Sequence, residues 1–370
     1  MEDVRRTKNI YYILIGVVIF IVAVVSLSYA FFVSQVSNNE STSTITGEAA
    51  NLNIIFKEGS EIIEDKAIFP GWEATKTFSV ENPGNSLGEY VIYIYDVVNE
   101  LMDGSIVFEI TSNSSGAKEF AEQSLPSFNT ILYPDNDASQ NPNIKIEGKA
   151  VHTYTLTVRY VNFENINQYP DAGKTFSFKV GIKKSAKSHS VTNLIANGSF
   201  ENGITGWTAS GGTFTTSNTY KKFGTYSLRN YHQAQWSLAR ETIAGYANHV
   251  YYTNLWMYSA NTGEKGCYTE YSPTWLESGT RKYAIQPALR QTTANVWEFK
   301  SGYYDLNLSH DYNIWYSVCV YDGTDGAQDC YCDGVMLIDL SADFGDDLPN
   351  QNWCDKYLTY FDSGSKDFYY

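Results

Sequence analysis

The chain has 370 residues, which is enough for two or three domains of ordinary size. Its formal net charge of -15 argues against a nucleic-acid partner, because phosphate binding needs clustered Lys and Arg. The 30 Tyr, 19 Phe and 8 Trp against 4 Met are typical of extracellular β-structure, where aromatic residues fill pleated faces. We therefore expect an all-β protein with two β-sandwich (jelly-roll) domains.

Residues 1–33 predict a transmembrane or signal helix. Three basic residues precede an uncharged apolar run over 10–33, which is long enough to cross a bilayer as a helix. The basic flank places the N-terminus inside the cell and everything after the run outside it. The segment thus predicts attachment to the membrane through this helix.

Cleavage is the alternative to anchoring, because Ser28-Tyr29-Ala30 offers the small residues of a signal-peptidase site. The stretch "SLSYAFF" resembles the "TYAYF" signal end of camelysin and of the fibre-forming biofilm matrix proteins of Gram-positive bacteria, which implies cleavage near Ala30. Both outcomes stay open: a single-pass protein on the outer face of the membrane, or a secreted one.

Residues 34–50 are a polar Ser/Thr/Asn stretch that predicts an exposed tether. The first domain is expected over 51–184, where short β-type runs alternate with turn residues. In one run, Tyr154, Leu156 and Val158 alternate with threonines, which predicts one buried and one wet face.

The first domain also carries a resemblance. "FPGWEATKTFSVENPGNSLGEYVIYI", "IEGKAVHTYTLTVRYVN" and "NQYPDAGKTFSFKVGIK" are similar to the β-sandwich of the camelysin and matrix-fibre class, which implies self-association through this sandwich. The class includes reported proteases, but no His-Glu-x-x-His or Gly-x-Ser-x-Gly motif stands in this sequence. We expect no enzyme, with His152 as a surface or capping residue and Trp72 as a core residue near a turn.

Residues 185–192 predict a linker, and 193–370 a second β-sandwich with a C-terminal tail. "NLIANGSFENGITGW", "KKFGTYSLR", "HVYYTNLWMYS" and "CDGVMLIDL" resemble, in this order, the jelly-roll carbohydrate-binding modules of the galactose-binding-like fold. The resemblance implies a polysaccharide or cell-surface glycan as partner. The tail "VMLIDLSADFGDD" looks like the ending of similar modules in phage tail and Gram-positive surface proteins, which implies display of the module.

Two carboxylates predict a cation site in this domain. Glu201 is expected at the sandwich edge, where the last long strand can bring Asp333 beside it, and two close carboxylates repel unless a cation lies between them. The resemblance implies a structural Ca²⁺ held by Glu201 and Asp333, with main-chain groups of Phe223 and Tyr226. The alternative is that Glu201 caps a turn and Asp333 makes local hydrogen bonds.

Sugar binding needs exposed aromatic rings. Trp207, Trp256 and Trp297 fall on apolar strand patterns and are expected in the core. Trp236 and Trp275 lie in polar, loop-like sequence, "HQAQWSLAR" and "YSPTWLESG", where a ring could stack on a pyranose. Gln235 or Arg240 would supply hydrogen bonds to the sugar.

The five cysteines all lie between 267 and 354, and none has metal-ligand spacing. In an exported protein they predict one or two disulfides, with Cys319 and Cys330 able to face each other across a hairpin, and at least one thiol left over.

The leading interpretation is a bacterial or phage-related surface protein that displays a Ca²⁺-stabilised, glycan- or polymer-binding module on a β-sandwich stalk. The alternative is a structural, fibre-forming surface protein without specific sugar binding. A glycosidase that uses paired carboxylates is the weakest hypothesis, since no second catalytic Glu motif is present.

Overall fold

A computed structural model describes the chain over 34–36, 43–46, 53–59, 62–64, 68–134, 141–183, 185–232, 237–262, 267–321 and 328–370. The chain divides into two compact units, Met1–Ala186 and Lys187–Tyr370, and the division falls within the predicted linker 185–192. The predicted helix over 1–33 lies outside the described residues. Within those residues, no helix is long and apolar enough to cross a membrane.

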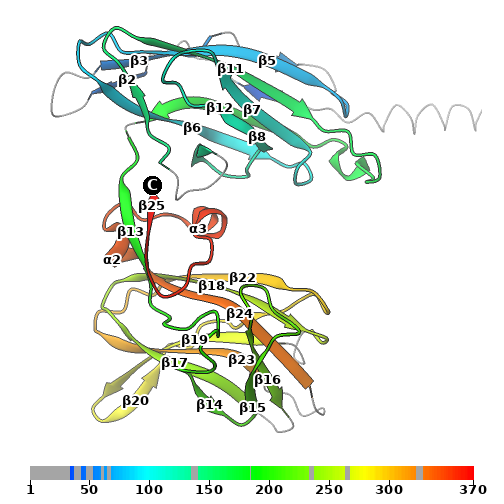
Figure 1. Cartoon of the computed structure of the whole chain (residues 1–370), viewed down its shortest axis with the longest axis vertical. Coiled ribbons are helices and arrows are strands. Elements are labelled where there is room, and N and C mark those ends of the chain that lie inside the picture. Colours follow the sequence, from blue (N-terminus) through cyan, green and yellow to red (C-terminus); the bar gives the residue numbers. More distant parts are fainter. Residues whose placement is uncertain are drawn as a thin grey trace, which may run out of the picture. The chain divides into compact units, whose positions relative to one another are not determined.

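Unit 1 consists of two six-stranded sheets (Figure 1). The first contains, in order, β10 (Ile144–Ile146), β6 (Gly88–Asn99), β12 (Phe176–Lys183), β1 (Ser34–Val36) and β4 (Ile62–Glu64), with β9 (Thr130–Ile131) paired to β6. The second contains β2 (Ser43–Thr46), β3 (Asn53–Lys57), β5 (Glu73–Glu81), β11 (Val151–Tyr160), β7 (Ile106–Ser112) and β8 (Phe120–Ser124). A short 3-10 helix, η2 (Tyr169–Asp171), precedes β12.

The core of unit 1 follows from alternation along its strands. On β11, Tyr154, Leu156 and Val158 are fully buried in a cluster with residues of both sheets, which confirms the predicted alternation. Trp72 packs on the same cluster and meets Phe176 edge-on at 6.3 Å between ring centroids, as expected of a core residue near a turn. The unit is therefore a β-sandwich.

His152 is not the surface residue that the sequence predicted. It is 2% exposed, because it shares the core-facing parity of Tyr154 on β11. Its Nδ1 lies 2.8 Å from the Tyr90 hydroxyl, which is 2.7 Å from the Tyr154 hydroxyl. Burial lowers the pKa of His152, so this buried trio is held by neutral hydrogen bonds.

Unit 2 also has two principal sheets (Figure 1). The first, which we call sheet E, contains β14 (Thr208–Ser210), β17 (Ser237–Gly245), β23 (Tyr312–Tyr321), β19 (Tyr268–Glu277) and β20 (Thr280–Tyr283), with β21 (Leu289–Arg290) paired to β19. The opposite sheet, sheet F, contains β15 (Thr213–Ser217), β16 (Ser227–His232), β24 (Gln328–Asp339), β18 (Val250–Ser259) and β22 (Glu298–Asp305).

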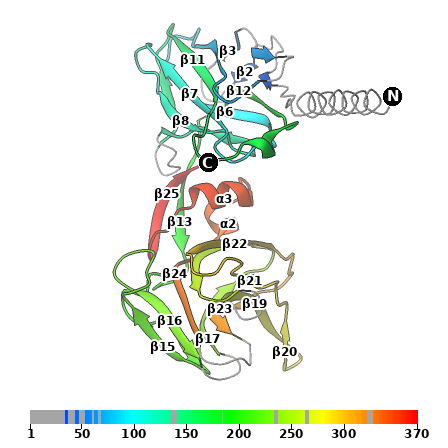
Figure 2. The same cartoon turned by 90° about the vertical axis from the view of Figure 1, so that its right-hand side faces the viewer.

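Residues from both sheets share one buried core, among them Ile314 and Tyr271 of sheet E and Leu228 and Leu255 of sheet F. Unit 2 is therefore a second β-sandwich, and the all-β prediction is confirmed for the described residues. Figure 2 shows β20 at one edge of this unit.

The end of the chain returns to the start of unit 2. The strand β25 (Gly364–Tyr369) pairs antiparallel with β13 (Ser188–Asn193). Two short helices precede it, α2 (Leu340–Phe344) and α3 (Gln351–Tyr357). Asp339 and Asn350 cap them by accepting main-chain N–H bonds from the third residue along, at 3.0 and 2.9 Å.

Four strands of sheet E were not predicted, namely β14, β17, β19 and β20. β17 and β19 run through the stretches that looked like loops around residues 236 and 275. Pro273 in the middle of β19 would normally argue against a strand. Its carbonyl accepts from the main-chain N–H of Ala284, so this side of Pro273 faces the gap between β20 and β21, where β19 has no ladder partner. The missing proline N–H therefore costs no ladder bond. Residues 284–288, between β20 and β21, are irregular.

Candidate functional site

The outer face of sheet E carries a row of polar and aromatic side chains. On β23, Tyr312, Ile314 and Tyr316 are buried, whereas Asn313 is exposed and Trp315 is half-buried. Trp315 therefore points away from the core. The register places it between Thr242 of β17 and Ser272 of β19. This position is near the middle of the sheet.

Three side chains surround the Trp315 ring. The guanidinium carbon of Arg240 lies 4.3 Å from the ring centroid, and that of Arg281 lies 4.7 Å from it. Tyr283 meets the same ring edge-on at 5.8 Å. Arg281 and Tyr283 come from the exposed strand β20, and Arg240 comes from β17. Such cation–π pairs hold guanidinium groups at the surface in a fixed orientation.

Arg240 is the predicted site residue that the structure places on this face. It lies on a strand rather than in the expected loop, and its Nε donates to Ser317 Oγ at 3.0 Å. Ser317 is paired with Glu270 across the ladder, and the negative charge of Glu270 acts on the guanidinium. Partial burial lowers the pKa of Arg240, and Glu270 opposes this shift.

An apolar patch closes one end of the face. Leu238, Tyr268 and Val320 form a buried cluster separate from the main core, and Ala288 packs on it. The segment that carries Ala288 is bonded to β19 through the Gln286 N–H and the Tyr271 carbonyl, at 3.1 Å. This end of the outer face is thus covered by the segment that carries Ala288.

A depression of about 590 Å³ lies at the other end. Its lining includes Trp275, His310, Asp311 and Asn313. Trp275 and His310 meet at 4.8 Å between ring centroids. Asn313 and Thr274 pair with each other on the outer face, next to Trp315. Trp275 and Tyr312 have the core-facing parity, so the depression lies at the end of the sheet and borders the outer face.

Trp275 occupies a different place from the one the sequence predicted. It is on β19 rather than in a loop, and it packs partly on the main core at the edge of the depression. It has the core-facing parity of Tyr271, so it borders the depression but does not lie on the outer face with Trp315. The other predicted ring, Trp236, and its neighbour Gln235 lie outside the described residues.

Sequence reasoning did not single out Trp315, although a signal was present. In "NIWYSVCVY", Trp315 shares its parity with Asn313 and Ser317, whereas Ile314, Tyr316 and Val318 share the other parity. An aromatic residue that alternates with the polar half of a strand is expected on the wet face.

The four residues of the predicted cation site do come together. Asp333 is fully buried on β24, and its Oδ2 accepts main-chain N–H bonds from Lys222 at 2.8 Å and Phe223 at 2.9 Å. A bulge in β24 follows Asp333 at Gly334, whose φ is 62°. The Gly334 N–H donates to Asp333 Oδ1 at 2.8 Å, so the carboxylate is fixed from both sides.

Glu201 binds the same loop from outside. Its Oε1 accepts from the main-chain N–H groups of Thr225 and Tyr226, both at 2.7 Å. Gly224 has a φ of 55°, and a Cβ at this position would lie 2.5 Å from Glu201 Oε1. We call residues 221–226, with Glu201 and Asp333, the carboxylate loop.

These contacts are those of the alternative interpretation, in which both carboxylates make local hydrogen bonds. The main chain at Phe223 and Tyr226 presents N–H donors to the carboxylates, whereas a Ca²⁺ site needs oxygen ligands. The two carboxylates still repel. The pKa of Asp333 is raised to about 6, chiefly by burial and in smaller part by the charge of Glu201, against the opposing effect of the three N–H donors. The carboxylates fit a cation, and the main chain in this conformation does not.

The outer face of sheet E thus combines guanidinium donors, a carboxylate, hydroxyl groups and an indole ring along one accessible surface. These groups can offer hydrogen-bond donors and acceptors, and an apolar contact, to a polar, hydroxyl-rich ligand.

No protein-family model matches the chain, and no curated protein matches it. Solved structures with partial similarity include a family 16 carbohydrate-binding module, at 21% identity over 39% of this chain and 99% of that chain, with a TM-score of 0.31. A tandem of two family 22 modules from Paenibacillus barcinonensis covers 84% of this chain and 99% of its own, at 10% identity and a TM-score of 0.32. A family 61 module in complex with β-1,4-galactotriose covers 39% and 97%, at 17% identity and a TM-score of 0.28. At such TM-scores the similarity does not bear on what this chain binds.

Proposed function

We propose that unit 2 binds a polysaccharide or cell-surface glycan along the outer face of sheet E. The observation that carries the proposal is the position of Trp315, which faces outward between Arg240, Arg281 and Tyr283. An indole edge and two guanidinium groups in one place supply apolar contact for a sugar ring and donors for its hydroxyl oxygens.

The exposed Arg281 governs access to the indole in this proposal. Arg281 is on the exposed strand β20 and contacts the same ring as Arg240. A sugar that stacks on Trp315 displaces the Arg281 guanidinium, which then bonds to the ligand from the side. The depression around Trp275 and His310 receives the next part of an extended glycan chain.

Stabilisation by Ca²⁺ is a second element of the proposal, at Glu201 and Asp333. The support is that two carboxylates share one loop and that burial and Glu201 both raise the pKa of Asp333. Binding requires the peptide groups of the carboxylate loop to turn, so that carbonyls replace the N–H groups of Phe223 and Tyr226.

Display outside the cell completes the proposed role. The apolar run over 10–33 and its basic flank support export, either with retention as a single-pass anchor or with cleavage near Ala30. Unit 1 then serves as the stalk that carries unit 2, and the bacterial or phage-related setting rests on the resemblances of both halves.

The test is affinity electrophoresis of residues 34–370, which contain both units, in gels with plant, fungal or bacterial polysaccharides. Retardation by one polysaccharide class supports the proposal. No retardation in any gel, together with concentration-dependent growth of the sedimentation coefficient, would favour the structural, fibre-forming alternative.

A further inference from the structure

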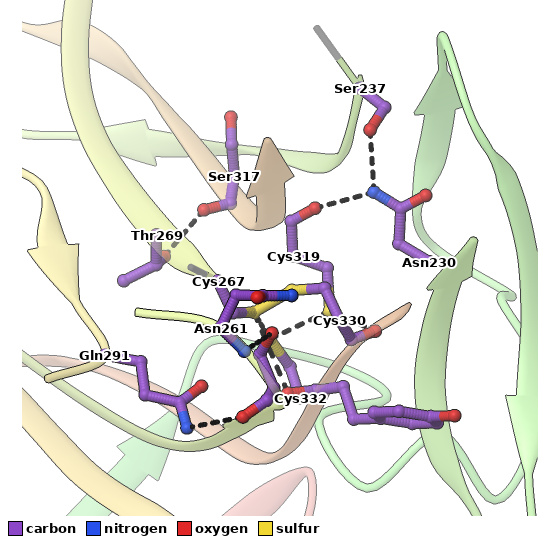
Figure 3. Close-up of a disulfide and its surroundings, with 12 residues drawn as sticks. Asn230, Ser237, Asn261, Cys267, Thr269, Gln291, Ser317, Cys319, Cys330 and Cys332 are labelled. Atoms are coloured by element: carbon purple, nitrogen blue, oxygen red, sulfur yellow. Dashed lines mark hydrogen bonds between the residues drawn. A yellow bond between two sulfur atoms is a disulfide. The ribbon is translucent and has the colours of Figure 1, made fainter. Parts of the chain in front are cut away.

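Four of the five cysteines form one buried cluster in unit 2. Cys267, Cys319, Cys330 and Cys332 are at most 2% exposed, and their sulfur atoms all lie within 4.8 Å of one another. Cys267 and Cys330 form a disulfide. The sulfur atoms of Cys319 and Cys332 lie 2.9 Å apart, compared with 3.6 Å between those of Cys267 and Cys332 (Figure 3).

The predicted pairing of Cys319 with Cys330 across a hairpin is wrong. Cys319 is on β23 of sheet E, and Cys330 is on β24 of sheet F, so the two strands are not hairpin neighbours. Cys330 instead pairs with Cys267, which lies just before β19. The remaining partner for Cys319 within the cluster is Cys332.

The backbone is distorted at Cys319 in a way that turns its side chain inward. Both neighbours of β23 lose register at this point, so β23 has one extra residue there. Cys319 itself has a φ of 47°, a conformation that favours glycine and is costly for a side chain. Without the bulge, Cys319 would follow the outward parity of Trp315 and Ser317.

The distortion is supported by a hydrogen bond between the sheets. The carbonyl of Cys319 accepts from Asn230 Nδ2 at 2.8 Å, and Asn230 is fully buried on β16 of sheet F. The strained backbone at Cys319 and the buried amide of Asn230 together hold the Cys319 sulfur beside that of Cys332.

From this geometry we propose that Cys319 and Cys332 form a second disulfide in the exported protein. The cluster then holds two bonds between the sheets, Cys267–Cys330 and Cys319–Cys332, and Cys354 remains as the single thiol. On β24, Cys330 and Cys332 stand three and one residues before Asp333. On β23, Cys319 stands four residues after Trp315. The strand under the candidate glycan face is thereby tied to the strand that carries the carboxylate loop.

The oxidation uses a disulfide, either of a thiol oxidoreductase or of a small molecule, as the two-electron acceptor. The Cys319 thiolate attacks this disulfide, forms a mixed disulfide and releases one thiol of the oxidant. The Cys332 thiolate then attacks Cys319 Sγ, which forms the Cys319–Cys332 bond and releases the second thiol. The two cysteine protons end on the two thiols of the reduced oxidant. Burial raises the pKa of Cys319, so the reaction takes place before unit 2 closes.

A zinc ion held by four thiolates is the competing use of the cluster. It would place an excess of two negative charges in a site where the residues labelled around the sulfurs in Figure 3, such as Asn230, Thr269 and Gln291, are all uncharged. The existing Cys267–Cys330 bond also removes two of its ligands.

The test is counting of free thiols in the full chain, produced by export or refolded in a glutathione buffer. The protein is unfolded in guanidinium without reductant, alkylated and weighed by mass spectrometry. We expect one alkylated cysteine in the wild type, none in Cys354→Ser, and two in Cys319→Ser. Cleavage after Tyr331 separates Cys330 from Cys332, and the peptide with Cys319 should be linked to the peptide with Cys332.

Three alkylated cysteines in the wild type and two in Cys354→Ser would overturn the proposal. A link from Cys319 to the Cys330 peptide, or one zinc per chain by elemental analysis of the untreated protein, would do so as well. The double variant Cys319→Ser/Cys332→Ser guards against misfolding, because it retains Cys267–Cys330 and should again show one alkylated cysteine.

Discussion

The guanidinium carbon of Arg240 lies 4.3 Å from the centre of the Trp315 ring, on the outer face of one sheet of unit 2. The two residues come from neighbouring strands, β17 and β23, and Arg240 is held in addition by Ser317 Oγ. A planar guanidinium that is fixed on both sides loses little entropy when it binds a ligand. This arrangement is the basis of the first prediction.

Arg240→Lys should weaken polysaccharide binding about tenfold, although the charge is retained, because an ammonium group cannot stack flat on Trp315 and bond to Ser317 at the same time. The measurement is isothermal titration with the polysaccharide that retards the wild type in the gel. Lys282→Arg on the exposed strand β20 is the control, and it should bind like the wild type. Equal affinity for Arg240→Lys would remove this residue from the site.

Removal of Ca²⁺ should lower the melting temperature of unit 2 by several degrees, since a ligand bound only to the folded state adds about 2.7 kcal/mol at a hundredfold excess over its Kd. Calorimetry with added Ca²⁺ and with EDTA measures this difference. Glu201→Gln should abolish it, whereas Glu277→Gln, at an exposed position of β19, should leave it intact. The Ca²⁺ proposal fails if the wild type shows no difference, or if Glu201→Gln shows the same one.

Gly224→Ala should destabilise unit 2 by about 2 kcal/mol, because the new Cβ forces Glu201 Oε1 off two N–H donors in addition to the cost of a positive φ. Gly203 provides a matched control. Its φ is 66° and a Cβ there would meet nothing within 4 Å, so Gly203→Ala should cost only about 1 kcal/mol. Denaturant unfolding of both variants gives the comparison, and equal losses would mean that the contact between Gly224 and Glu201 has no energetic weight.

Glu241 should make the stability of unit 2 depend on pH. It lies on β17, its Oε2 is buried without a hydrogen-bond partner, and burial raises its pKa from 4.5 to about 7, opposed by a bond from the Ala196 main chain. A carboxyl with a raised pKa binds its proton more tightly in the folded state. The free energy of unfolding therefore rises as the pH falls through about 7, and it levels off near 4.5.

Glu241→Gln should reduce this slope, leaving the part that Asp333 contributes through its own raised pKa of about 6, and should stabilise unit 2 at pH 8 by about 1 kcal/mol, a value reduced for the partial exposure of the side chain. Chemical denaturation between pH 4 and 8 measures both curves. If the free energy of unfolding of the wild type instead decreases as the pH is lowered from 7 to 5, the Glu241 carboxyl is solvated and its pKa is not raised.

Most of the long strands, and Arg240 of the candidate site, could be predicted from the sequence. Alternation along β11 and β23 is visible in the letters, and the pairing of Glu201 with Asp333 follows from the order of the motifs, although the two lie far apart in the chain. The resemblance of residues 50–184 to the camelysin class stays a prediction.

Other features depend on three-dimensional detail that local patterns do not contain. The interruption between β20 and β21 allows Pro273 to sit in a strand, and it can be recognised only once the neighbours of β19 are known. The loop conformation decides whether the main chain at Phe223 and Tyr226 directs N–H or C=O groups toward the carboxylates. The sequence is compatible with both conformations. The sequence "YSVCVY" also contains no signal for the bulge that turns Cys319 inward.

The most direct test of the proposed function is isothermal titration of the best polysaccharide with the wild type, Trp315→Ala and Trp256→Ala. Trp256 is half-buried on sheet F, where Lys222 lies 3.6 Å from its ring centroid. If the outer face of sheet E binds the glycan, Trp315→Ala loses affinity at least about tenfold while its melting temperature stays close to that of the wild type, and Trp256→Ala binds normally. Undiminished affinity in a folded Trp315→Ala protein, or a loss confined to Trp256→Ala, would contradict the proposed site.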